Sequence, residues 1–153
     1  MKTMLMSVVS LFFVMVLVCS ATLAHADEKE DAVKMVKDAV AYYKANGMEK
    51  TLDILNDPKS QFTAGNLYVF AYDLNGTMMA NTAKPALVGQ NVIDVPDADG
   101  KKFRRDIIDI AQKSGSGWVD YKTIHPKTKL TEQKTTYFEK VDELVLACGI
   151  YKK

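Results

Sequence analysis

The sequence has few of the side chains that bind metals or act as nucleophiles and bases. Its 153 residues include two cysteines and two histidines. These occur in none of the Cys-x-x-Cys, His-x-x-x-His or Cys-x-x-Cys-His spacings that hold metals and c-type haem. The chain also has no Gly-x-Ser-x-Gly nucleophile turn and no phosphate-binding glycine loop. We therefore expect no metal, no cofactor and no enzymatic activity.

The sequence also lacks an excess of charge of either sign. Lys2 is the only charged residue before Asp27, so residues 27–153 hold 19 basic and 19 acidic side chains. A protein that binds nucleic acid needs a basic surface to neutralise the phosphates. We therefore expect no nucleic acid among the partners of this chain.

Long hydrophobic runs are scarce too, since a single one extends from Val8 to Val18. It is shorter than the stretch of about 20 apolar residues that spans a membrane. Lys2 precedes it, and the small residues of Ala24-His25-Ala26 follow it. This layout predicts a secretory signal peptide over residues 1–26, removed after Ala26, and export to the periplasm. A retained N-terminal membrane anchor is the alternative. Residues 27–153 then form one domain.

Cleavage would remove Cys19 and leave Cys148 without an internal disulfide partner. Cys148 lies in the apolar run 144–150, which predicts a buried, inert thiol. His125 would be the remaining histidine, and its place in a polar loop before Pro126 predicts a solvated side chain. Arg104 and Arg105 are expected on the exposed face of a helix.

Hydrophobic periodicity predicts three helices. Val33, Val36, Val40 and Tyr43 recur at helical spacing after an acidic start, and Asn46-Gly47 ends this long helix. A shorter helix follows over residues 48–55 before Pro58. The third helix is expected over residues 103–111 and ends near Gly115.

The period then changes to two in five segments, which predicts five strands. Asn75-Gly76 and Asp142-Glu143 provide tight turns between neighbouring strands. Short turns imply an antiparallel sheet with the helices outside it, so the fold class is α+β. The expected strands are residues 67–72, 77–81, 118–124, 133–141 and 144–151.

Six blocks in this order resemble the single Cache domain family, and they lie between residues 31 and 151. The blocks are Leu67-Tyr-Val-Phe-Ala-Tyr-Asp-Leu-Asn-Gly76, Leu87-Val-Gly-Gln-Asn91, Asp97-Ala-Asp-Gly-Lys-Lys-Phe103, Gly117-Trp-Val-Asp-Tyr121, Lys134-Thr-Thr-Tyr-Phe138 and Ala147-Cys-Gly-Ile-Tyr151. The resemblance implies an extracytoplasmic sensor domain with a PAS-like fold. A long N-terminal helix would cover one face of the sheet, and a helix and loops would form a pocket on the other. Family members often have His-Pro where this chain has Asn81-Thr82.

Lys134 is the first candidate for holding a ligand. The family resemblance implies a pocket for a small carboxylate, and a lysine at this position is a recurrent pocket residue of the family. Alternation along the strand places Lys134, Thr136 and Phe138 on one face and Thr135 and Tyr137 on the other. An ammonium group offers three N–H donors to a carboxylate. A solvent-facing lysine is the alternative.

The other ligand-binding candidates are aromatic or amide side chains, which pockets use as walls with polar tips. Each of them could instead be ordinary core or surface. Trp118 and Tyr121 point to opposite faces of one strand, so we expect one of them to reach the ligand. The predicted set is Lys134, Tyr68, Phe70, Tyr72, Asn81, Phe103, Trp118, Tyr121 and Tyr137.

The sequence therefore predicts a periplasmic sensor module that binds a small organic carboxylate. No membrane span or output domain follows residue 151, so we expect a separate membrane-bound signalling partner. The alternative is a periplasmic protein-interaction module whose pocket has become core. A weak homodimer through Val33, Val36 and Val40 is a further expectation, although the same stripe would also suit packing on the sheet.

Overall fold

The computed structural model describes residues 27–152 of the chain. The predicted signal peptide, with Cys19 and His25, lies outside the described residues. The chain divides into two compact units, residues 1–31 and 32–153, and the fold below is that of the second. Within residues 27–152, no helix has the length and apolar character needed to cross a bilayer.

Three helices form where the periodicity predicts them. Residues 27–46 are helical, and Gly47 ends this helix with a φ of 83°, a left-handed value that a residue without Cβ adopts at little cost. Helix α2 (Met48–Asn56) ends before Pro58, and α3 (Phe103–Ser114) ends at Gly115. The structure adds a short 3-10 helix, η1 (Pro85–Leu87), that the sequence did not predict.

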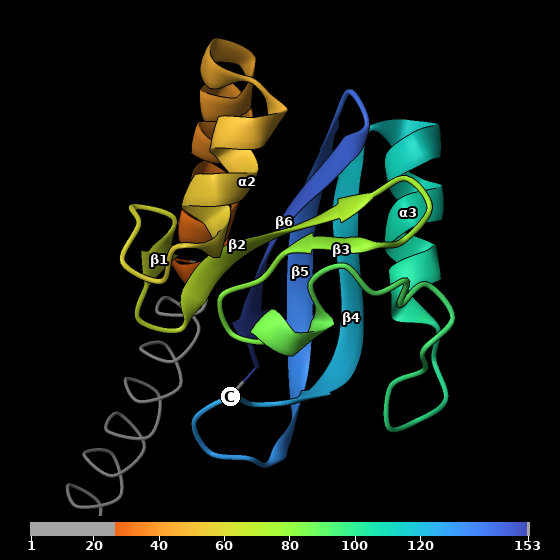
Figure 1. Cartoon of the computed structure of the whole chain (residues 1–153). Coiled ribbons are helices and arrows are strands. Elements are labelled where there is room, and N and C mark those ends of the chain that lie inside the picture. The colour runs from red at the N-terminus through yellow and green to blue at the C-terminus, as the bar shows by residue number, and fades with distance from the viewer. Residues whose placement is uncertain (1–26, 153) are drawn as a thin grey trace, which may run out of the picture. The chain divides into compact units, whose positions relative to one another are not determined.

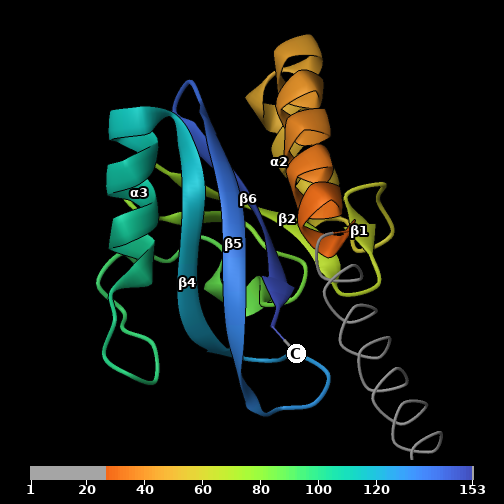
Figure 2. The same cartoon turned by 180° about the vertical axis from the view of Figure 1, so that it is seen from behind.

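The strands form one antiparallel sheet, which confirms the α+β class. Its order is β1-β2-β6-β5-β4, and β3 pairs with β2 off this path (Figures 1 and 2). The short β1 was not predicted. The bounds are β1 (Thr63–Ala64), β2 (Leu67–Asp73), β3 (Met78–Ala80), β4 (Ser116–Ile124), β5 (Thr131–Val141) and β6 (Leu144–Tyr151).

Each face of the sheet carries its own hydrophobic core. Val69 and Ala71 of β2 belong to one core, and Tyr68, Phe70 and Tyr72 belong to the other. The central strand β6 is buried along its whole length, because its side chains belong to the cores on both faces of the sheet. The N-terminal helix lies on one face, and α3 lies along β4 on the other (Figures 1 and 2). The alternation read from β2 therefore separates two cores rather than a core and a wet face.

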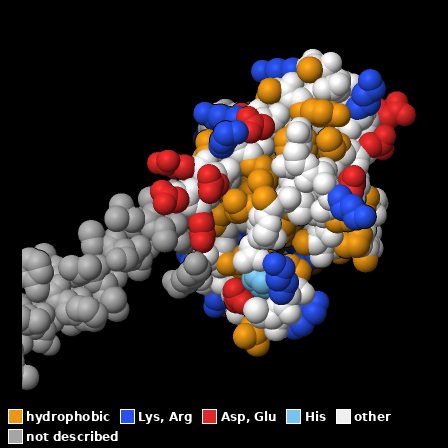
Figure 3. Space-filling view, turned by 90° about the vertical axis from the view of Figure 1, so that its left-hand side faces the viewer, with side chains coloured by type: hydrophobic (Ala, Val, Ile, Leu, Met, Phe, Trp, Pro, Cys, Tyr) orange, Lys and Arg blue, Asp and Glu red, His pale blue; other side chains and the backbone are white. Residues whose placement is uncertain are grey.

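The long N-terminal helix packs its apolar stripe on the sheet. Val36 is fully buried and Val40 is 9% exposed, and both belong to the core that includes β6. Packing on the sheet is the alternative that the sequence also suited for this stripe, and a homodimer stays a prediction. On the side of the molecule shown in Figure 3, basic and acidic side chains both occur among hydrophobic ones.

The turn after β2 is held by a close approach between two segments. Gly76 has a φ of 82°, and a Cβ at this position would collide with the side chain of Ile93. Val92 N–H donates to the carbonyl of Gly76 over 3.0 Å. Glycine at position 76 therefore lets the loop between β3 and α3 pack directly on the β2–β3 turn.

Candidate functional site

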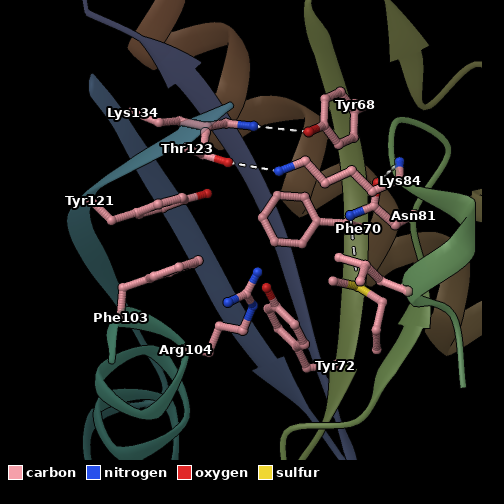
Figure 4. A pocket seen from close by; sticks show the side chains of 12 residues that line it. Tyr68, Phe70, Tyr72, Asn81, Lys84, Phe103, Arg104, Tyr121, Thr123 and Lys134 are labelled. Atoms are coloured by element: carbon pink, nitrogen blue, oxygen red, sulfur yellow. Dashed lines mark hydrogen bonds between the residues drawn. The ribbon is translucent and has the colours of Figure 1, made fainter. Parts of the chain in front are cut away.

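A small pocket lies between the sheet, the N-terminal end of α3 and the loop that follows β3. Its cavity measures about 20 Å³, which is room for about one water molecule. Seven of the nine predicted ligand-binding residues line it, namely Tyr68, Phe70, Tyr72, Asn81, Phe103, Tyr121 and Lys134. Five further lining residues were not predicted: Met78, Lys84, Leu87, Arg104 and Thr123 (Figure 4).

Lys134 reaches the pocket from β5 and is only 1% exposed. Its Nζ donates a hydrogen bond to the Tyr68 hydroxyl over 3.0 Å. The same Nζ lies 4.5, 5.6 and 4.8 Å from the ring centres of Tyr68, Phe70 and Tyr151, within the range of cation–π attraction. The lysine is therefore a buried cation surrounded by aromatic rings.

Gly149 on β6 makes room for this lysine. A Cβ at position 149 would collide with Cε of Lys134 and Oγ1 of Thr136. The Lys134 side chain therefore runs directly over the backbone of the neighbouring strand. The placement of the ammonium depends on the absence of a side chain at residue 149.

Two further cations line the pocket. Arg104 was expected to face solvent, but it is only 8% exposed, and that expectation is corrected. Helical spacing in the sequence could have indicated this burial, because Arg104 shares a helical face with the buried residues Ile108 and Ala111, four and seven positions later. Lys84 comes from a loop, where no periodicity marks an inward side chain. Its Nζ donates to Thr123 Oγ1 over 2.7 Å.

The pocket is cationic because no acidic side chain offsets these charges. Among the described residues that line it, none is Asp or Glu. Burial lowers the pKa of Lys84, and the positive charges of Lys134 and Arg104 lower it further. Like charges that are close and desolvated repel one another strongly. An anion placed between them would relieve this repulsion.

Three tyrosine hydroxyls supply neutral donors. Burial raises the pKa of Tyr68 and Tyr72 to about 12 each, and it also raises the pKa of Tyr121. All three therefore keep their protons at neutral pH. The ring of Tyr121 stacks on Phe103 with 3.8 Å between the ring centres, and its hydroxyl lies 3.0 Å from Thr136 Oγ1. The stacked rings of Tyr121 and Phe103 form an apolar wall of the pocket.

Asn81 lines the pocket and also shapes the loop beside it. Its Oδ1 accepts hydrogen bonds from the backbone N–H groups of Ala83 and Lys84, over 3.0 and 2.9 Å. Its Nδ2 faces Met78 Sδ at 3.7 Å. The side-chain carbonyl of Asn81 therefore holds the segment that carries Lys84 in place.

Trp118 and Tyr137 do not reach this pocket. Their rings pack against each other with 5.3 Å between the ring centres, and both border the core on the other face of the sheet. Trp118 and Tyr121 do lie on opposite faces, as predicted. Tyr121 is the one that reaches the pocket, and Trp118 and Tyr137 belong to the opposite face.

His125 and Cys148 are both buried. The prediction of a solvated histidine is wrong, because His125 is 5% exposed, with its ring centre 4.2 Å from that of Tyr151. Its Nδ1 accepts backbone N–H groups of Lys127 and Thr128, which closes the loop locally. Cys148 is buried as predicted, and burial raises its pKa to about 11, so the thiol stays protonated. Residues 27–152 contain no cluster of three or more His, Cys, Asp and Glu placed to hold a metal ion.

Asp97 ties the loop beside the pocket to strand β4. Its Oδ1 accepts the backbone N–H groups of Asp99 and Lys101, and its Oδ2 accepts that of Lys122, each over 2.9 Å. Burial acts to raise the pKa of Asp97, but these three donors outweigh it, and the pKa is lowered. The carboxylate therefore helps to set the start of α3, where Phe103 and Arg104 lie.

Replacing Asp97 with alanine is expected to lower the free energy of unfolding by about 1–3 kcal/mol, because three N–H groups lose a charged acceptor. A carboxyl group with a lowered folded-state pKa stabilises above its unfolded pKa of about 4 and loses this effect as the pH falls through the lowered value. The difference in the free energy of unfolding between the unaltered protein and Asp97→Ala should therefore be largest at pH 7 and shrink as the pH is lowered. Urea unfolding at several pH values measures it.

The neighbouring Asp99 provides the control for this experiment. Asp99 pairs with Lys122 at the surface, with a side chain that is 60% exposed, and such pairs contribute little. Asp99→Ala should change stability by less than about 1 kcal/mol. Equal losses for both variants, or a loss at Asp97 that does not vary with pH, would contradict the role given to Asp97.

Comparison with known proteins identifies the class of this architecture. A family model described as a Cache domain matches residues 24–152. No curated protein matches the sequence. Solved structures of chemotaxis and chemosensory proteins also resemble this chain, each at less than 25% identity, so the likeness to them concerns the fold.

Three of these structures cover most of the chain. A methyl-accepting chemotaxis protein from Vibrio parahaemolyticus is 24% identical, with a TM-score of 0.72, 88% of this chain covered and 95% of the other. A Cache chemosensory domain described in terms of carboxylic acid recognition is 22% identical, with a TM-score of 0.68 and coverages of 84% and 96%. A periplasmic sensor domain of a chemotaxis protein is 21% identical, with a TM-score of 0.63 and coverages of 81% and 90%.

Proposed function

Because this chain belongs to the Cache domain family, whose members are sensory ligand-binding modules, we propose that it binds a small organic carboxylate outside the cytoplasm. Acetate, propionate, lactate and pyruvate are the ligands of the expected size. The module would pass the binding event to a separate membrane-bound partner. Such a partner can respond only if the ligand changes the populations of two states of the domain.

The observation that carries this proposal is the buried, unneutralised ammonium of Lys134. A cation taken out of water costs several kcal/mol unless an opposite charge or hydrogen bonds replace the solvent. In the described structure Lys134 has three aromatic rings and one hydroxyl around it. A carboxylate would supply the missing negative charge, and the hydroxyls of Tyr68 and Tyr121 lie nearby to orient it.

A protein-interaction module without a small ligand is the second candidate, and the size of the cavity favours it. At about 20 Å³ the cavity holds about one water molecule, so a carboxylate can enter only if side chains move. A pocket that had become ordinary core would not require buried cations, however. Lys84, Arg104 and Lys134 at one site therefore support a ligand-binding role over this alternative.

The test is a thermal-shift titration of the protein purified from the periplasm of an expression host. A carboxylate at 100 times its dissociation constant should stabilise the domain by about 2.7 kcal/mol, a rise in Tm of several degrees. Lys134→Met removes the charge while keeping a side chain of similar length. We expect this variant to lose the ligand-induced rise in Tm, because the carboxylate can then no longer pair with the ammonium of Lys134.

Lys140 is the matched control, because it lies on the same strand and outside the pocket lining. Lys140→Met should keep the full shift. No shift with any carboxylate in the unaltered protein would transfer support to the interaction module. A shift that survives in Lys134→Met would show that the anion binds elsewhere.

A further inference from the structure

The three cations of the pocket are distributed between its two ends. Lys134 and Lys84 lie at one end, beside Tyr68 and Thr123 (Figure 4). Arg104 lies at the other end, next to the hydroxyl of Tyr72. The aromatic rings of the pocket separate the two ends. This arrangement differs from a site for a single carboxylate, in which all donors converge on one point.

Arg104 is incompletely satisfied in its position. The side chain is only 8% exposed, and its Nη1 donates to the backbone carbonyl of Val95 over 3.1 Å. Its buried Nε finds no hydrogen-bond acceptor among the described residues. The guanidinium carbon lies 4.3 Å from the ring centre of Phe103. A buried guanidinium with a free N–H has the geometry to receive a carboxylate.

The charges decide how many carboxylates the pocket can accommodate. One carboxylate at the Lys134 end would leave two of the three cations without a counterion, and Arg104 would keep its unsatisfied Nε. A carboxylate at each end would leave one excess positive charge. Lys84 is half-buried and is attached through a flexible four-carbon stem, so its side chain can turn aside from Thr123 and leave space between the ends.

We propose that the preferred ligand is a small dicarboxylate, with one carboxylate between Lys134 and Lys84 and the other on Arg104 and Tyr72. This inference rests on the carboxylate-binding function proposed above and specifies the ligand class of the same site. Tyr72 donates its hydroxyl proton to the second carboxylate, and Arg104 donates through Nε. The apolar chain of the ligand lies against Phe70 and Tyr121.

Isothermal titration calorimetry of the purified protein at pH 7 tests this with two matched pairs of probes. Malonate is compared with propionate, and succinate with butyrate, so that each pair differs by one carboxylate. We expect at least one dicarboxylate to bind 10-fold or more tightly than its partner. Arg104→Gln should remove this advantage, because it weakens the dicarboxylate about 3-fold or more beyond any change in the affinity of the monocarboxylate partner.

Two variants guard against a folding defect at the buried arginine. Tyr72→Phe removes only a hydroxyl at the Arg104 end and should weaken dicarboxylate binding by about 3-fold or more beyond any change for the monocarboxylate partner. Arg105→Gln is the control, because Arg105 pairs with Asp94 on the surface and should retain the preference.

Equal affinities within both pairs would overturn the dicarboxylate inference while leaving the carboxylate-binding function in place. Equal weakening of both ligand classes by Arg104→Gln and by Tyr72→Phe would also overturn it. Absence of binding by all four acids would instead refute the proposed function itself.

Discussion

Replacing Phe138 with alanine is expected to lower the free energy of unfolding by about 3–5 kcal/mol. Phe138 is fully buried on β5, in the core that α3 covers. Its ring lies over Gly117 of β4, where a Cβ would come within 3.2 Å of Cζ, and Ile110 of α3 lies over the same glycine. The sheet and the helix therefore meet through this ring, and its removal leaves a cavity that the backbone cannot close.

Urea unfolding followed by circular dichroism measures this loss. The substitution should also lower Tm by about 10–20 °C for a domain of this size. A loss of about 3–5 kcal/mol is a large fraction of a total stability of about 5–15 kcal/mol. Phe138→Leu keeps most of the volume and should cost less than about 2 kcal/mol. A loss below about 1 kcal/mol for the alanine variant would show that α3 does not rely on this contact.

Replacing Gly149 with alanine is expected to impair both stability and ligand binding. The added Cβ would take the space of Lys134 Cε and Thr136 Oγ1. Overpacking of this kind costs about 1–3 kcal/mol, and the displaced ammonium would no longer reach the pocket. Carboxylate affinity should fall 10-fold or more in calorimetry, even at a temperature where the variant is folded.

A double-mutant cycle with Lys134→Ala tests the contact between the two residues directly. If Gly149→Ala acts by displacing the lysine, truncation of Lys134 makes room for the new methyl group. The double variant should then be more stable than the sum of the single losses predicts, by at least about 0.5 kcal/mol. Additive losses would mean that Thr136 or the strand backbone, and not Lys134, carries the effect of the substitution.

Much of the local structure follows from the order of the residues. The three main helices and five of the strands formed where the periodicity placed them, because a period of 3.6 or 2 depends only on neighbouring positions. The same alternation placed Tyr68, Phe70 and Tyr72 on one side of β2, and it separated Trp118 from Tyr121. The buried, protonated Cys148 followed from its apolar surroundings.

Which side of each strand faces the pocket was decided by tertiary structure. Lys134 and Tyr68 are 66 positions apart in the sequence. They meet because β5 and β2 flank β6 on either side, and Lys134 extends over Gly149 of β6 to reach Tyr68. Trp118 and Tyr137 were assigned to the ligand although the pairing of β4 with β5 places them together on the other face. Alternation determines that two side chains differ in direction, but only strand pairing determines which direction leads to the pocket.

The sequence by itself determined an α+β domain with a short list of aromatic side chains and one lysine as pocket candidates. Only the tertiary structure brought Lys84 and Arg104 into one pocket with that lysine and packed the ring of His125 against Tyr151. One physical reason is that loops have no periodicity that would predict an inward side chain. The other is that a charged residue on a helix is expected to face solvent, and only the tertiary structure shows which element covers it. The electrostatic character of the pocket, on which the ligand proposals depend, therefore emerged only when segments distant in the sequence were folded together.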